Sequence, residues 1–419
     1  MAATVTPPRG MRDFLPREKA TRERALGVIR RSFAAHGFDE IETPVMEDSA
    51  RLHSGLGGDN EKLAFAVMKR ALGADDLAAA AASGDPLALA DLGLRFDLTV
   101  PLARFYATHR GSLPAVFRSI QIAPVWRAER PQKGRYRQFM QCDIDIIGEA
   151  GPLAELELIT ATASALDALG LTGCSIRIND RRILAGLLAH WGVPAGQTER
   201  ALITIDKLDK VGVDGVVDEL SAQGIETVGV ADALRDLVEA GWELHASDTP
   251  PPAWLATDAY ADLLALRAAM PGVDLVFDPT LVRGMGYYTG TIFEITHPEL
   301  GYSLGGGGRY DGMIGRFLGT EVPACGFSIG FERIVDLLTE ELEPRRAAVV
   351  LIHDKDADPA TLLALKAELI AEGSRVRLER RTKNLKPLFE RAAEAGYGSF
   401  AFVGADGGDL ASLDLKPLG

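Results

Sequence analysis

The chain has 419 residues, of which 47% are hydrophobic and 25% charged, and this composition predicts a globular protein of two or three domains. Its net charge of −14 argues against indiscriminate nucleic-acid binding, so any nucleic-acid partner must bind a local basic patch. The sequence has no apolar run of about 18 residues and no signal pattern, which argues against a membrane span and predicts a cytoplasmic protein. It also has no paired-cysteine motif and no spaced histidine pair, which argues against a disulfide framework and a zinc site.

Two elements are expected near the N-terminus. Apolar residues recur at helical spacing within residues 17–36, which predicts an amphipathic helix that Gly37 ends. Residues 38–46 then have the composition of a strand and contain Pro44. Residues 70–93 are rich in Ala and Asp, so we expect a helix and a loop there rather than chemistry.

A strand with one polar face is predicted at residues 94–104. Arg95, Asp97 and Thr99 alternate with apolar residues, as they would in a strand with one buried and one accessible face. An ordinary half-exposed strand and a ligand-binding strand both fit this pattern.

Residues 124–148 have the pattern of a strand, a basic loop and a second strand, which predicts an antiparallel hairpin. Gln141, Asp143 and Asp145 alternate onto one face of the second strand. The hairpin would hold phosphate beside an ammonium or imidazole group, because guanidinium groups match phosphate oxygens and carboxylates accept from nitrogen. Solvated charges on an exposed hairpin are the alternative. Five cations lie within eleven residues of the loop: Arg127, Arg130, Lys133, Arg135 and Arg137.

The central part of the chain is predicted to be mostly helical. Residues 152–169 form a helical pattern that Gly170 ends, and residues 175–180 form a short strand. Residues 183–270 contain further helical patterns, and no spacing among them indicates chemistry.

Three stretches follow that contain candidate ligand-binding residues. Arg283 is followed by Gly284 and Gly286 and then by Tyr287 and Tyr288, which predicts a bulged backbone that brings a cation and a phenol to a pocket. Residues 304–312 contain four consecutive glycines but lack the Lys-Ser/Thr of a phosphate-binding loop. Residues 323–334 are predicted to be a strand that enters a helix, with Arg333 at the junction. Core tyrosines and a solvated arginine are the alternatives for these side chains.

The composition changes after residue 345. Apolar strands and amphipathic helices alternate from there to the end, which predicts a small α/β domain with a parallel sheet. This domain has a locally basic patch although the whole chain is acidic. Seven cations lie between residues 375 and 391: Arg375, Arg377, Arg380, Arg381, Lys383, Lys386 and Arg391.

Taken together, these segments resemble the histidyl-tRNA synthetases, a family of class II aminoacyl-tRNA synthetases. Residues 126–139 resemble motif 2 of that class, residues 17–46 motif 1 and residues 323–334 motif 3. The stretches around Arg283 and residues 307–311 resemble the two histidine-specific motifs.

The resemblance implies an α+β fold with a class II antiparallel sheet flanked by helices, a helical insertion and a small C-terminal α/β domain. The implied domains are residues 1–182 and 271–340 for the two parts of the catalytic domain, 183–270 for a mostly helical insertion, and 345–419 for an anticodon-binding-like domain. The implied assembly is a homodimer.

The resemblance also implies an activity: histidine is activated with ATP and Mg²⁺ to histidyl-adenylate and then transferred to the 3′ end of tRNA(His), releasing AMP and pyrophosphate. The expected catalytic residues are Arg127 and Arg283, and no protein metal ligand is expected. The expected ATP-binding residues are Arg127, Glu129, Arg135, Arg137 and Arg333. The expected histidine-binding residues are Asp97, Thr99, Gln141, Asp145, Tyr287 and Tyr288.

Three features depart from the family pattern. Gly286 stands where the family carries Asp, Pro387 interrupts the usual basic helix start, and the sequence ends short of the family's last helix at Gly419. The alternative from another class is a paralogue such as the regulatory subunit of ATP phosphoribosyltransferase, which is a histidine-binding module without tRNA charging.

Overall fold

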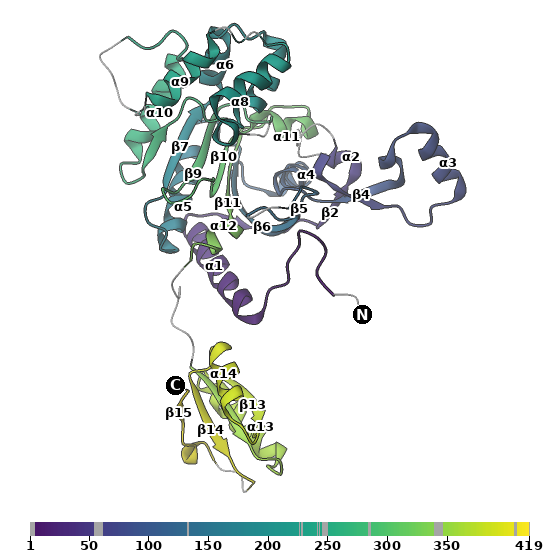
Figure 1. Cartoon of the computed structure of the whole chain (residues 1–419), viewed down its shortest axis with the longest axis vertical. Coiled ribbons are helices and arrows are strands. Elements are labelled where there is room, and N and C mark those ends of the chain that lie inside the picture. The colour runs from purple at the N-terminus through teal and green to yellow at the C-terminus, as the bar shows by residue number, and fades with distance from the viewer. Residues whose placement is uncertain are drawn as a thin grey trace. The chain divides into compact units, whose positions relative to one another are not determined.

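A computed structural model describes residues 5–53, 62–131, 134–225, 227, 229–240, 242, 244, 250–283, 286–338, 347–405 and 409–418. Contacts between residues divide the chain into two units. The first unit comprises Met1–Arg12 and Leu26–Leu338, and the second comprises Asp13–Ala25 and Thr339–Gly419. Figure 1 labels the elements, and each unit is described by itself below. In the part of the chain described here, no helix combines the length and the apolar character needed to cross a membrane.

The first unit is built on a large mixed sheet. Among the described residues, the pairs β1 with β5 and β7 with β8 are parallel and the other pairs of this sheet are antiparallel. The strands in spatial order are β1 (Asp39–Glu40), β5 (Phe117–Trp126), β6 (Gln138–Ile147), β11 (Ala324–Gly330), β10 (Gly305–Arg309), β9 (Thr291–Thr296), β7 (Ser175–Asp180) and β8 (Leu275–Phe277). This arrangement confirms the predicted α+β class with a mostly antiparallel sheet.

Helices flank this sheet, and α6, α8, α9 and α10 gather at its β7 end (Figure 1). A smaller sheet in the order β2 (Met46–Asp48), β4 (Ala90–Leu94) and β3 (Phe65–Met68) lies in the same unit. The α-helices up to residue 338 are α1 (Pro16–Ala35), α2 (Ser49–Leu52), α3 (Ala74–Ser83), α4 (Thr99–His109), α5 (Leu153–Ala168), α6 (Arg181–His190), α7 (Thr198–Ile205), α8 (Leu208–Ala222), α9 (Val230–Glu239), α10 (Thr257–Ala269), α11 (Asp311–Leu318) and α12 (Phe331–Val335). The short 3-10 helices of this region are η2 (Pro86–Leu89), η3 (Arg110–Ser112) and η4 (Ala195–Gln197).

The predicted hairpin is confirmed as β5 and β6. Their antiparallel register runs from Phe117 opposite Ile147 to Trp126 opposite Gln138. Because β11 pairs with the other side of β6, β6 is a central strand and is buried from Gln141 onward. Cys142, Ile144 and Ile146 occupy one face, so Gln141, Asp143 and Asp145 alternate onto the other.

The structure corrects the strand predicted at residues 94–104. Strand β4 ends at Leu94, and α4 begins at Thr99. An oxygen of Asp97 accepts a hydrogen bond from the backbone nitrogen of Val100 at 3.1 Å, and Pro101 lies in the first turn, where its missing N–H costs nothing. The polar residues therefore mark a helix start, where a short acidic side chain satisfies a free N–H.

The four consecutive glycines lie in the central strand β10. A Cβ atom added to Gly307 would lie 1.9 Å from the carbonyl oxygen of Gly326 on β11. A side chain there would collide with the neighbouring backbone, so glycine permits the close approach of strands beneath the site.

The second unit contains a four-stranded sheet. Its order is β13 (Arg375–Arg380), β12 (Ala348–His353), β14 (Ser399–Val403) and β15 (Lys416–Pro417), with α13 (Pro359–Ala371), α14 (Lys386–Glu394) and η5 (Leu410–Ser412). The pairs of β12 with β13 and β14 are parallel, which confirms the predicted alternation, and β15 adds an antiparallel edge. The division of the chain into catalytic, inserted and C-terminal domains stays a prediction.

Candidate active site

A cavity of about 750 Å³ lies in the first unit. It is lined by residues of β6, β9, β10 and β11, the start of α4, the loop after β5, and the junction of α7 and α8. Most of the side chains expected to bind ligands line it: Asp97, Thr99, Arg127, Glu129, Arg135, Gln141, Asp145, Arg283, Tyr287, Tyr288 and Arg333. The structure therefore brings together residues that lie more than 230 positions apart in the sequence.

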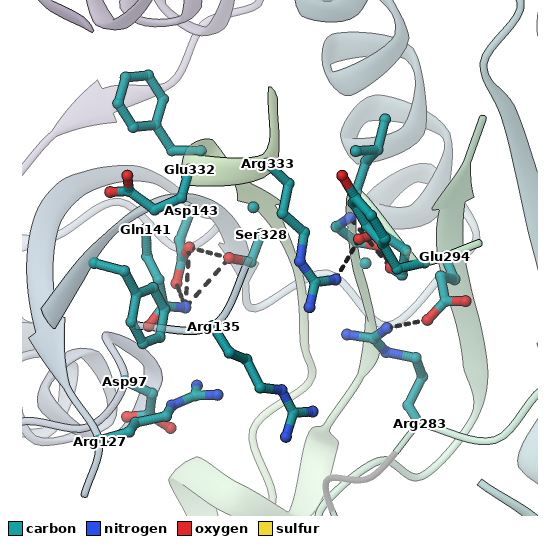
Figure 2. A pocket seen from close by; sticks show the side chains of 18 of the residues that line it. Asp97, Arg127, Arg135, Gln141, Asp143, Arg283, Glu294, Ser328, Glu332 and Arg333 are labelled. Atoms are coloured by element: carbon teal, nitrogen blue, oxygen red, sulfur yellow. Dashed lines mark hydrogen bonds and ion pairs between the residues drawn. The ribbon is translucent and has the colours of Figure 1, made fainter. Parts of the chain in front are cut away.

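Among the described residues, five arginines line this space, and three of them, Arg127, Arg130 and Arg135, belong to the loop after β5. Figure 2 shows Arg127, Arg135, Arg283 and Arg333 extending into it. Nε of Arg127 donates to the carbonyl oxygen of Phe96 at 2.9 Å, and Arg135 forms an ion pair with Glu129 at 3.0 Å. Arg333 lies in the first turn of α12 and donates to the carbonyl oxygen of Ser303. Burial and the nearby charge of Arg135 lower the pKa of Arg333. Cations held this close repel one another, so a bound polyanion would stabilise them.

Arg283 enters the cavity beside β9 and β10. Its Nη1 donates to an oxygen of Glu294 at 2.6 Å. Glu294 lies on β9 directly opposite Gly306 of β10. A Cβ atom added to Gly306 would lie 2.8 Å from Cζ of Arg283. The guanidinium group therefore lies against bare backbone, which only glycine leaves free.

Buried carboxylates lie on the β6 side of the same cavity. Asp143 accepts from Ser328 on β11 and from Gln141 at 3.2 Å, and Asp145 accepts from the hydroxyl of Tyr310 at 2.7 Å. Burial and the neighbouring charge of Asp145 raise the pKa of Asp143 well above its usual range. Burial raises the pKa of Asp145 to about 7, although the hydrogen bond from Tyr310 acts in the opposite direction. The cavity thus has a cationic side for phosphate and an acceptor side for nitrogen donors.

Tyrosine rings complete the acceptor side. The rings of Tyr287 and Tyr288 have centroids 4.8 Å apart, and those of Tyr287 and Tyr310 are 5.8 Å apart. Burial is the main cause that raises the pKa of Tyr287 well above its usual range. These phenols therefore stay neutral and can donate as well as accept hydrogen bonds beside Asp145.

Arg137 was expected at the site and is not among the described residues that line the cavity. Its Nε donates to the carbonyl oxygen of Glu129 at 3.0 Å, and its backbone nitrogen donates to the carbonyl oxygen of Gly10 at 2.8 Å. These contacts hold the basic loop to itself and to the N-terminal segment at Gly10. Lys133 and Gly284, which belonged to the predicted pattern, lie outside the described residues.

Arg309, the arginine in the second histidine-specific motif, connects secondary-structure elements, and the described lining of the cavity does not include it. Its guanidinium pairs with both oxygens of Glu155 on α5, at 2.6 Å each. It also donates to the carbonyl oxygens of Glu149 and Gly151. This buried two-pronged pair connects β10 to α5, while the next residue, Tyr310, holds Asp145.

Several cavity residues were not expected from the sequence. They are Asp206, Asp209 and Lys210 at the α7–α8 junction, Glu294 on β9, Ser328 on β11 and Glu332 on α12. The charged run at residues 206–210 was visible in the sequence, but nothing local indicated that a helical segment would reach the site. A Cβ atom at Gly286 would lie 2.8 Å from Oε1 of Glu199 on α7. The Glu199 side chain is exposed and can move aside, so this contact does not by itself require glycine.

The acceptor side does not resemble a metal centre. Among the residues that the structure describes, no group of three or more His, Cys, Asp or Glu side chains could hold a metal ion. Glu129 lines the cavity beside Arg127 and Arg135. A carboxylate among arginines suits a Mg²⁺ ion that arrives with phosphate oxygens, which supply most of its ligands.

Known proteins resemble this chain over its whole length. A family model described as "Histidyl-tRNA synthetase" matches residues 10–334. The histidine–tRNA ligase of Leifsonia xyli subsp. xyli is 64% identical over 435 residues, which cover 100% of this chain and 99% of that protein. The histidine–tRNA ligase of Aeropyrum pernix is 36% identical over 417 residues, which cover 95% of this chain and 90% of that protein.

Solved structures show the same fold. The crystal structure of histidyl-tRNA synthetase from Nostoc sp. PCC 7120 has a TM-score of 0.77 and 27% identity, and the match covers 100% of this chain and 95% of that chain. An ATP phosphoribosyltransferase regulatory subunit/histidyl-tRNA synthetase from Bacillus halodurans C has a TM-score of 0.73 over 96% of this chain and 99% of that chain, and at 21% identity it shows the fold alone. By the family match, the relatives and the shared fold, this chain belongs to the histidyl-tRNA synthetase family.

Proposed function

We propose that this chain is a histidine–tRNA ligase that activates histidine with ATP and transfers it to the 3′ end of tRNA(His). The observation that carries the proposal is the division of one cavity into an arginine side and a side of buried carboxylates and tyrosines. ATP phosphates suit the first side, and the amino group and ring of histidine suit the second. Membership of the family and the 64% identity to a histidine–tRNA ligase support this assignment.

The first step joins a carboxylate oxygen of histidine to the α-phosphorus of ATP and breaks the bond to pyrophosphate. No protein nucleophile is needed, so catalysis depends on placing the two substrates and on stabilising the charge that develops at the α-phosphate. Arg127 and Arg283 act on that charge. Arg333 and Arg135 bind the outer phosphates. Glu129 would hold a Mg²⁺ ion that accompanies ATP, and the ion would offset phosphate charge. The role of Arg137 as an ATP ligand stays a prediction. Its Nε donates to a backbone carbonyl, and Arg137 is not among the described residues that line the cavity.

Histidine occupies the acceptor side of the cavity. Asp97, Thr99 and Gln141 receive its α-amino group, and its imidazole lies between Asp145 and Tyr288, with Tyr287 alongside. Asp97, Gln141 and Asp145 are at most 9% exposed. Burial makes such acceptors selective, because a ligand that lacks matching donors leaves them unsatisfied. In the second step the terminal hydroxyl of tRNA attacks the carbonyl carbon of the adenylate and AMP leaves.

The proposed assembly is a cytoplasmic homodimer formed through residues 20–46, with residues 345–419 as an anticodon-binding-like domain. The domains at residues 1–182, 183–270 and 271–340 belong to the same proposal. Sedimentation that finds an active monomer at micromolar concentration would exclude the dimer.

The decisive experiment is histidine-dependent exchange of labelled pyrophosphate into ATP, followed by charging of tRNA(His). Both reactions are expected. Exchange without charging would restrict the chain to amino-acid activation. Histidine binding without exchange would indicate a regulatory module like the ATP phosphoribosyltransferase subunit.

A further inference from the structure

Arg177 on β7 binds three carboxylates although it does not itself line the cavity as described. Its partners are Glu294 on β9, Asp278 after β8, and Asp209 on α8. The distances to Asp278 and Asp209 are 3.0 Å and 3.1 Å. Arg177 and Glu294 stand directly opposite each other in the β7–β9 register, so their pairing follows from the sheet itself.

Glu294 connects this arginine to the cavity. One of its oxygens accepts from Arg177 and the other from Arg283, and its side chain is 12% exposed. Burial opposes ionisation of Glu294, but the charges of Arg283 and Arg177 outweigh it and lower the pKa. The carboxylate is therefore shared between two guanidinium groups, one outside the cavity and one inside.

The place of Arg283 depends strongly on this carboxylate. Below it lies the bare backbone of Gly306, which offers no side chain to hold it. Its Nε is buried and has no hydrogen-bond partner among the described residues, whereas Nη1 is bound by Glu294. Tyr288 and Asp206 also interact electrostatically with Arg283, but the hydrogen bond described for its guanidinium is the one that Nη1 donates to Glu294.

We propose that Arg177 is a positioning residue for adenylate formation: it occupies one oxygen of Glu294, so that the other oxygen holds Arg283 with its guanidinium directed into the cavity. This inference rests on the proposed role of Arg283 at the α-phosphate. Because Arg177 also binds Asp209, it connects the helical segment that carries α8 to the same carboxylate.

Loss of Arg177 has a definite chemical consequence. Glu294 would have one guanidinium left, and a carboxylate paired with a single arginine favours the two-pronged geometry that uses both oxygens. Arg283 would turn toward Glu294 and away from the reacting phosphate. Ground-state binding of ATP would change little, because the other arginines would still hold the phosphates.

The test is pyrophosphate exchange by Arg177→Gln in the full-length protein. We expect kcat to fall by about 10- to 100-fold, the scale of displacing a catalytic group by about 1 Å, with the KM for ATP nearly unchanged. Arg177→Lys keeps the charge without the planar fork, so it should recover part of the rate. Asp209→Asn should reduce the rate less than Arg177→Gln, since its side chain is 68% exposed.

The matched control is Arg182→Gln. Arg182 also binds three carboxylates, Asp180, Asp258 and Asp262, but none of these groups lines the cavity. This variant should keep the wild-type rate. Equal losses in the two glutamine variants would show a general structural effect and overturn the proposal.

A double variant separates this inference from the proposed function. Arg283→Ala alone should lower kcat by about 10²-fold, the scale of removing one transition-state donor. Arg177→Gln should add no further loss in that background, because it acts through Arg283.

Absence of exchange in the wild type would refute the proposed function, and a normal rate in Arg283→Ala would refute the catalytic role of Arg283. If Arg283→Ala is impaired but Arg177→Gln has a normal rate, the positioning role alone is overturned. The same conclusion follows if the losses of the two single variants add in the double variant. If Arg177→Gln misfolds and does not bind ATP, the exchange rates of Arg177→Lys and Asp209→Asn are measured instead. Each is compared with wild type and with the same change in the Arg283→Ala background.

Discussion

At the scale of single residues, the site works through a few buried carboxylates whose environments differ. Asp145 contacts Tyr310 and has its pKa raised to about 7, whereas Glu294 is held between two arginines and has its pKa lowered. The first is poised to change charge near neutral pH, and the second stays ionised. This contrast suits one carboxylate for ligand recognition and the other for holding a cation.

Asp145→Asn is expected to weaken histidine binding much more than ATP binding. The amide keeps the size and can still accept from Tyr310, but it loses the negative charge that a ring N–H would meet. The loss is expected to be about 1.5–3 kcal/mol, the scale of a hydrogen bond to a charged group. Calorimetric titration with histidine and with ATP measures both affinities. An equal loss for the two ligands would instead indicate a folding defect.

The raised pKa of Asp145 also predicts a pH-dependent stability. Asp titrates near pH 3.9 in unfolded chains, so between about pH 4 and pH 7 the native protein holds a proton that the unfolded chain has released. The free energy of unfolding should therefore fall as pH rises through this window, by at most about 1.4 kcal/mol per pH unit for one group. Asp143 acts in the same direction.

Urea unfolding from about pH 5 to about pH 7.5 measures this slope. The wild type should lose stability as pH rises, and Asp145→Asn should have a shallower slope because one titrating group is gone. Parallel pH profiles for the two proteins would contradict the assignment of a raised pKa to Asp145.

At the scale of elements, the glycine strand β10 lets β9, β10 and β11 approach closely beneath the cavity. Gly307→Ala should destabilise the protein by about 1–3 kcal/mol or more, because its Cβ would meet the backbone of β11. Gly312→Ala is the matched control: this glycine lies in α11 with no atom within 4 Å of an added Cβ, and the change should be neutral or stabilising by up to about 1 kcal/mol. Thermal unfolding compares them, and similar midpoints would refute the packing argument.

At the scale of the whole molecule, an acidic chain contains a basic patch in its second unit. Lys383 and Lys386 follow β13 and are exposed. Replacing both with Ala should leave pyrophosphate exchange intact and weaken tRNA charging. The salt dependence of tRNA affinity should become shallower by about one log–log unit per lost phosphate contact.

Lys355 and Lys416 supply the control for that experiment. Both are exposed, and Lys416 lies on β15, at the opposite edge of the sheet from β13. Replacing this pair with Ala removes the same charge from elsewhere in the unit. Equal salt slopes in the two double variants would show that the patch at residues 375–391 does not contact tRNA.

Features that depend on residues close together in the chain could be predicted from the sequence. The β5–β6 hairpin, the polar face of β6, the β11–α12 junction and the alternating elements after residue 345 were all predicted, because period, turn residues and charge runs are local properties. Most of the site residues expected from family-specific motifs also line the cavity.

The contacts between residues of different motifs depend on the tertiary structure and could not be predicted from the sequence. Asp97 lies just before a helix and accepts from its first turn instead of lying in a strand, Arg309 is bound to α5, and Arg137 braces a loop. The contacts of Arg177 and Glu294 depend on the register of two strands more than 100 residues apart. Such pairings arise from the packing of distant segments, and a local pattern of side chains has no information about which distant partner will stand opposite it.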